Sequence, residues 1–290
     1  FDKEFNANVS INLGDKFNDN FKNKDYFNND GRLNYNGALK KSSRYKFSKI
    51  KNFYQFEPKI SFVNKNIIFF DNKGSILKFD ENSKLIWKKN YYNKNEIKQR
   101  PVINFAANNK ILIAADNLAN LYAIDYLNGN LIWKNFNKSS FNSEIKIFDD
   151  KVFLVDYENV IRCISIEDGK EIWSFGTEKS FIKSQRKLSL IIQNNQVIFI
   201  DTFGDINSLD IETGSLNWQT QTINEYIYES AFLLKNSKLV SDNETIYISN
   251  NQNSFFAIDI NSGIIKWEQK INTYLDPSII ENLVLTISQD

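Results

Sequence analysis

The chain contains no histidine and no methionine, and among its 290 residues it has one cysteine and three prolines. Without histidine, His-ligated metal sites, histidine general bases and Ser-His-Asp triads are excluded. The single cysteine, Cys163, excludes an intrachain disulfide, a cysteine-rich zinc site and a cysteine-ligated iron–sulfur cluster. Several classes of enzyme are therefore ruled out before any motif is considered.

Long apolar runs are also absent, since no stretch approaches the ~18 apolar residues that a membrane-spanning helix needs. No signal segment is visible, and without an initiator methionine we expect the sequence to be a piece of a longer product. The 36 basic residues balance 35 acidic ones, for a net charge of +1, which argues against a dedicated nucleic-acid-binding protein. With 42% hydrophobic residues, the chain can nevertheless bury a core.

What the sequence does contain is a repeated unit, and its five tryptophans mark the repeat. They are Trp87, Trp133, Trp173, Trp218 and Trp267. A glycine stands four residues before each of the last four: Gly129, Gly169, Gly214 and Gly263. An aspartate stands eight residues before three of them: Asp125, Asp210 and Asp259. The first copy has Ser83 at the glycine place, in a shorter turn, and the third has Ser165 at the aspartate place.

Each unit has the pattern of strands separated by turns. A second apolar run lies upstream of each tryptophan segment, and a third precedes it, which gives about four strands per unit. Asn128-Gly129 and Asp168-Gly169 predict tight hairpins of type I′, a turn that needs positive φ at both central residues. The three prolines fall at one phase of the repeat, where a strand begins and proline is tolerated.

Units of 40–50 residues with four strands each predict an all-β fold, a β-propeller of four-stranded blades. We count five clear repeats, a degenerate one around Gly31, Asn36-Gly37 and Lys41, and a partial one over 276–290. Residues 1–27 are expected to form an irregular segment or edge strand, and 28–290 a single propeller domain. The chain is expected to be a fragment of a propeller with seven or eight blades. Each tryptophan would fill the gap to the neighbouring blade.

The repeated polar residues have a structural interpretation. Aspartates at one repeat phase lie one blade apart around the ring, so hydrogen bonds that cap turns are expected, not a catalytic or metal constellation. The glycines supply turn geometry, because no phosphate-binding glycine motif accompanies them. Cys163 stands where other repeats have alanine, which predicts a small buried residue. We therefore predict no catalytic, cofactor-binding or metal-binding residue.

One connection departs from this pattern, over residues 174–190. Phe181 and Ile182 are flanked there by basic residues that include Lys183 and Arg186. Apolar anchors with a charged rim suit protein docking. The alternative is an ordinary solvated connection. A basic and aromatic stretch over 22–53 could suit single-stranded nucleic acid. Most of its residues are instead explained as strands of the degenerate repeat, so no nucleic-acid partner is predicted.

The segments around Trp133, Trp218 and Trp267 resemble the tryptophan-docking motif of the PQQ-type (quinoprotein-like) propeller repeat, A-x-D-x-x-T-G-x-x-x-W. In repeat size the chain is most similar to the BamB family of outer-membrane-assembly lipoproteins. That resemblance implies a non-catalytic scaffold without cofactor, located in the periplasm, whose protein partner is the outer-membrane barrel assembly machine. A lipid anchor, where present, would precede Phe1.

Two alternatives stay open. The same repeat occurs in quinoprotein dehydrogenases, which carry pyrroloquinoline quinone and Ca²⁺. The resemblance to them implies adjacent cysteines and a tryptophan under the quinone, yet Cys163 has no neighbouring cysteine and all five tryptophans occupy repeat positions. The second alternative is a propeller that senses a ligand in its channel. A fold alone does not decide among these functions.

Overall fold

The structure is a computed structural model that describes residues 29, 44–46, 60–63, 66–71, 73–179, 187–223 and 233–288. It confirms the all-β prediction. Within these ranges the chain forms five four-stranded antiparallel sheets, one two-stranded sheet and one short helix. The degenerate repeat predicted around Gly31, Gly37 and Lys41 lies outside the described residues, as do all of residues 1–27.

Each sheet is a meander in which every strand pairs with the next along the chain, so each sheet is one blade. The first blade contains β1 (Ile60–Val63), β2 (Asn66–Phe70), β3 (Ser75–Phe79) and β4 (Leu85–Asn90). The second contains β5 (Ile103–Ala107), β6 (Ile111–Asp116), β7 (Asn120–Asp125) and β8 (Leu131–Phe136). The third contains β9 (Lys146–Phe148), β10 (Lys151–Val155), β11 (Val160–Ser165) and β12 (Glu171–Gly176).

The fourth blade contains β13 (Leu190–Gln193), β14 (Gln196–Ile200), β15 (Ile206–Asp210) and β16 (Leu216–Thr220). The fifth contains β17 (Val240–Ser241), β18 (Thr245–Asn250), β19 (Ser254–Asp259) and β20 (Ile265–Gln269). The two-stranded sheet that follows pairs β21 (Ser278–Ile280) with β22 (Leu283–Leu285). The prediction of four strands per unit is therefore confirmed for the five clear repeats.

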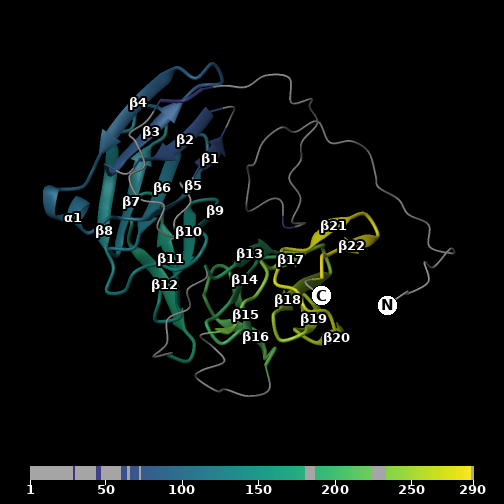
Figure 1. The fold of residues 1–290 in the computed structure, drawn as a ribbon. Helices are drawn as coiled ribbons and strands as arrows, with labels where there is room; N and C mark the ends of the chain where they lie inside the picture. The colour runs from purple at the N-terminus through teal and green to yellow at the C-terminus, as the bar shows by residue number, and fades with distance from the viewer. Residues whose placement is uncertain are drawn as a thin grey trace.

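The blades are arranged around a common centre, with the first strand of each blade inside and the fourth outside (Figure 1). Neighbouring first strands are in contact: β5 lies against β1 and β9, β9 against β13, and β17 against β21. The short helix α1 (Lys94–Lys98) lies in the connection from β4 to β5, where a capping box formed by Asn93 and Glu96 begins it.

The hydrophobic core is divided among the spaces between blades. Between the first two blades, Ile68 and Ile76 belong to one buried cluster with Leu112 and Tyr122. Similar clusters join the second blade to the third, the third to the fourth and the fourth to the fifth. One sheet cannot bury both of its faces alone, so each blade depends on its neighbours for burial.

Because the strands alternate in direction, the chain turns at two faces of the propeller. The turns between first and second strands, and between third and fourth, lie on one face, which we call the turn face. The other face, which we call the connection face, carries the turns between second and third strands and the points where the chain leaves one blade and enters the next. The links between blades cover 91–102, 137–145, 177–189, 221–239 and 270–277, so they differ in length.

The predicted type I′ turns are wrong. Gly129 and Gly169 have φ of 73°, but Asn128 and Asp168 do not have positive φ. The turn is wider: the Gly129 amide donates to the Asp125 carbonyl, and the Asp125 amide to the Asn130 carbonyl. A wider loop with one left-handed glycine replaces the two-residue turn. A β-bulge follows in all five four-stranded blades, immediately after the residue paired with the tryptophan.

Candidate functional site

The tryptophan of each of the first four blades lies on the third-to-fourth-strand turn of the next blade. A Cβ built on the glycine of that turn would lie 2.5–2.8 Å from the tryptophan ring of the preceding blade. Real Cβ atoms do not approach so closely, so only glycine fits. The pairs are Trp87 with Gly129, Trp133 with Gly169, Trp173 with Gly214, and Trp218 with Gly263.

Hydrogen bonds fix the same contacts. The indole nitrogen donates to a backbone carbonyl in the next blade, at 3.2 Å from Trp87 to Tyr126 and 2.8 Å from Trp133 to Ile166. The corresponding distances are 3.2 Å from Trp173 to Ile211 and 3.1 Å from Trp218 to Ile260. A buried indole N–H needs an acceptor, and a carbonyl at one repeat phase supplies it each time. These contacts join neighbouring blades into one body.

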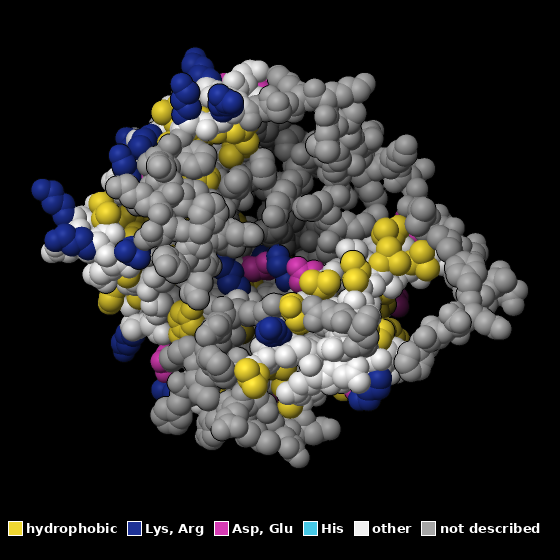
Figure 2. All heavy atoms as spheres, viewed as in Figure 1, with side chains coloured by type: hydrophobic (Ala, Val, Ile, Leu, Met, Phe, Trp, Pro, Cys, Tyr) yellow, Lys and Arg dark blue, Asp and Glu magenta, His cyan; other side chains and the backbone are white. Residues whose placement is uncertain are grey.

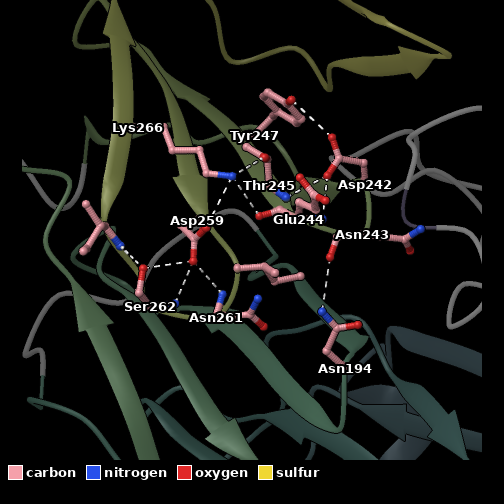
Figure 3. Close-up of polar contacts among 12 residues, drawn as sticks. Asn194, Asp242, Asn243, Glu244, Thr245, Tyr247, Asp259, Asn261, Ser262 and Lys266 are labelled. Atoms are coloured by element: carbon pink, nitrogen blue, oxygen red, sulfur yellow. Dashed lines mark hydrogen bonds and ion pairs between the residues drawn. The ribbon is translucent and has the colours of Figure 1, made fainter.

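The repeated aspartates lie in the same turns. The Asp259 carboxylate accepts hydrogen bonds from the Asn261 and Ser262 amides and from the Ser262 hydroxyl, and it pairs with Lys266 at 3.3 Å (Figure 3). These donors hold the pKa of Asp259 at about 2. Asp125 and Asp210 accept equivalent amide hydrogen bonds. Each carboxylate is thus engaged by its own turn.

Lys266 also reaches the adjoining turn of the fifth blade. Its ammonium donates to the Thr245 hydroxyl at 2.9 Å and to the Glu244 carbonyl at 3.2 Å (Figure 3). The Asn194 side-chain amide, from the fourth blade, donates to the Asn243 carbonyl at 3.2 Å. The turn face is therefore linked both within a blade and between blades.

A second set of repeated aspartates, which we did not predict, lies buried on the connection face. Each stands at the end of the second strand in one of the first four blades: Asp71, Asp116, Asp156 and Asp201. The fifth blade has Asn250 at this position. One carboxylate oxygen of each aspartate accepts the backbone amides two and four residues later. The sequence signal was present, because the apolar runs FFD, AAD, LVD and FID each end in aspartate.

Asp201 differs from the others because a second carboxyl group, that of Asp205, lies in its own turn. Burial, together with the charge of Asp205, raises the pKa of Asp201 to about 7. A perturbed carboxyl group can signal a catalytic acid. Here, however, the carboxylate accepts the Phe203 and Asp205 amides at 2.9 and 3.0 Å, which is the turn-capping role of its counterparts.

The single cysteine, as predicted, is a small buried residue. Cys163 is fully buried in β11, and burial raises the pKa of its thiol to about 12, so the nucleophilic thiolate is disfavoured. No group of three or more Asp, Glu or Cys side chains that could hold a metal ion occurs in the described ranges. Within them, too, no helix has the length and hydropathy to cross a membrane.

The predicted docking residues Phe181, Ile182, Lys183 and Arg186 lie outside the described residues. The described residues on either side of them, Lys179 and Lys187, are exposed on the connection face. The structure therefore gives the two ends of this segment, and its role as a docking site stays a prediction.

Comparison with known proteins identifies the family. The family model described as outer membrane protein assembly factor BamB matches residues 72–290. The chain belongs to the BamB family. No curated protein matches it by sequence.

Solved structures share the propeller. BamB from Moraxella catarrhalis matches with a TM-score of 0.67 and 15% identity, over 80% of this chain and 70% of that one. The designed Ika8 protein matches with a TM-score of 0.62 and 11% identity, over 78% and 65%. A quinohemoprotein alcohol dehydrogenase from Pseudomonas putida matches with a TM-score of 0.56 and 14% identity, over 73% of this chain but 41% of that one. At these identities the likeness shows the fold alone.

Proposed function

We propose that this protein is a non-catalytic interaction scaffold that assists the assembly of outer-membrane β-barrel proteins. The observation that carries the proposal is the BamB family match across residues 72–290. Its partner would be the barrel assembly machine, and its location the periplasm, with attachment to the outer membrane through a lipid anchor. No cofactor is required by this role.

The mechanism that we propose uses the difference between the two faces. The turn face carries the tryptophan contacts that recur between the first five blades, so partners are expected to bind the connection face, where the links vary in length. Phe181 and Ile182 would supply the apolar anchors there, while Lys183 and Arg186 would steer an acidic partner surface.

The first test is capture of the full-length protein by the periplasmic domains of the outer-membrane assembly barrel from the same organism. We expect saturable binding, and a loss of about tenfold or more for the double variant Phe181→Ser/Ile182→Ser, as for other anchor residues. The matched control is Leu131→Ser/Ile132→Ser, which changes an exposed apolar pair on the outer strand β8. The control should bind within about twofold of the wild type.

Thermal melting of each variant separates a docking effect from a folding effect. Absence of saturable capture would reject the scaffold proposal, and an equal loss in both double variants would reject the docking segment. A parallel titration with pyrroloquinoline quinone and Ca²⁺, followed by tryptophan fluorescence, addresses the dehydrogenase alternative that the structural neighbour from Pseudomonas putida keeps open. Quinone binding at micromolar concentration that requires Ca²⁺, without capture, would favour that enzyme.

A further inference from the structure

Side chains from four successive blades form one group near the centre of the propeller, with one carboxylate among them. Glu144 precedes β9. One of its carboxylate oxygens lies 3.8 Å from the Lys146 ammonium, and the other lies 2.7 Å from the Lys238 ammonium. Lys187 precedes β13, and its ammonium donates to the side-chain oxygen of Asn104 on β5. Lys238 precedes β17, so blades two to five all contribute to this group.

The backbone explains why these residues converge. The Leu188 amide donates to the Asn142 carbonyl and the Glu144 amide to the Leu188 carbonyl, so the segments before β9 and β13 pair in parallel. The Leu239 amide donates to the Ser189 hydroxyl, which fixes the segment before β17 beside them. Each segment leads into a first strand from the connection face. Basic and acidic side chains gather at the edge of the hollow in the middle of the molecule (Figure 2).

The lysines set the electrostatics of this place. Burial alone raises the pKa of Glu144, but Lys146, Lys238 and Lys187 together hold it below its ordinary value. Three ammonium groups near one another repel, and a partly desolvated setting strengthens both that repulsion and the attraction of an anion. The arrangement is therefore tuned to hold negative charge.

Two of these lysines are also exposed to solvent. The Lys238 side chain is 56% exposed, whereas that of Glu144 is 20% exposed, and Lys187 is exposed as well. A bound anion could contact these exposed lysine side chains from the solvent side, where it would compete with Glu144.

We propose that Lys146, Lys187 and Lys238 form a binding site for a small phosphate-class oxyanion, with at least two negative charges, on the connection face at the edge of the central hollow. Lysine offers a compact point charge, which suits a tetrahedral oxyanion, whereas planar bidentate recognition of a carboxylate favours arginine. Glu144 occupies part of the anion's surroundings and weakens its binding. This site goes beyond the scaffold role and does not depend on it.

The test is calorimetric titration of the full chain with inorganic pyrophosphate at constant ionic strength, with acetate as the monovalent comparison. We expect saturable binding of one pyrophosphate and no saturable binding of acetate. The double variant Lys187→Gln/Lys238→Gln should bind at least tenfold more weakly. The matched control, Lys170→Gln/Lys270→Gln, removes two highly exposed lysines that also pair with carboxylates, and it should bind like the wild type.

A variant with the opposite effect sharpens the test. Glu144→Gln removes the competing charge, so pyrophosphate should bind several-fold more tightly, and a retained melting transition would show that the variant folds. Absence of saturable pyrophosphate binding would overturn the proposal. So would equal affinity in the wild type and the Lys187/Lys238 variant, or an equal loss in the control, because either result would place the anion elsewhere.

Discussion

Trp218 and Trp267 occupy the same repeat position in adjacent blades, but their surroundings differ. Trp218 is 8% exposed and is docked on Gly263 of the fifth blade. Trp267 is 38% exposed, and its ring contacts are with Phe255 and Tyr247 of its own blade. The described residues after β20 include no glycine turn for it to dock on. The comparison teaches that the burial of this tryptophan comes from the turn of the next blade wherever such a turn is described.

Replacing each tryptophan by alanine gives the largest expected difference. Trp218→Ala should lower the free energy of unfolding by about 3–5 kcal/mol, because it leaves a cavity between two blades. Trp267→Ala should cost about 1–2 kcal/mol, since a partly exposed ring loses less burial. Urea denaturation of both variants measures the two values. Equal losses would show that Trp267 is docked in solution as Trp218 is.

The glycines allow the same comparison from the other side of the interface. Gly263→Ala should cost about 2–4 kcal/mol, because the new methyl group meets the Trp218 ring and the residue has a φ of 73°. Ser83 holds the equivalent turn in the first blade with a φ of 64°. Ser83→Ala should therefore change stability by no more than about 0.5 kcal/mol.

Thermal and urea unfolding of the two alanine variants would decide this prediction. A Gly263→Ala protein as stable as the Ser83→Ala protein would mean that the tryptophan moves aside without cost, which the close packing at Gly263 argues against.

A smaller, pH-dependent difference should separate Asp201 from its buried counterparts. Its pKa of about 7 lies above the ordinary 3.8, so the folded state holds the proton more tightly, and this group's contribution to stability falls as pH rises from about 4 to 7. Asp201→Asn keeps an oxygen for the turn amides, as Asn250 does in the fifth blade. It should stabilise the protein at pH 8, by about 4 kcal/mol at most, and have little effect at pH 4.

Asp116→Asn is the matched control, because the second oxygen of Asp116 accepts from the Tyr92 hydroxyl and the Asn120 side chain. An amide nitrogen there would face donors, so this variant should be destabilised at both pH values. Melting temperatures across pH 4–9 provide the measurement. A destabilised Asp201→Asn protein at pH 8 would contradict the assignment of a raised pKa.

The parts of the fold that could be predicted are those with a local signal. The spacing of Trp133, Trp173 and Trp218 and the apolar runs before them were sufficient for four-stranded blades, because strand period and turn residues are short-range features. The turn conformation was missed because Asn128-Gly129 suits a two-residue hairpin, whereas the Asp125 carboxylate and the bulge favour a wider loop with one left-handed residue.

The candidate site could be predicted only in part, because its contacts join distant positions. Glu144 and Lys238 belong to different blades, and nothing near either residue in the sequence indicates that they meet. The buried aspartates, such as Asp71 and Asp156, are different. Each is visible in the sequence at the end of an apolar run, but an aspartate beside a turn can be buried or exposed, so the sequence does not predict its burial. The arrangement of the blades around the centre brings such distant residues together, and short sequence patterns do not contain that information.

The unequal links of the connection face have a consequence for how such a protein can change. The tryptophan contacts between successive blades lie toward the turn face, where the Trp218 indole meets Gly263. The links over 137–145 and 221–239 differ in length without altering those contacts. Sequence drift, or deliberate loop exchange, can therefore be concentrated on one side of the molecule while the other preserves the assembly. Different binding surfaces can therefore evolve on the same propeller scaffold.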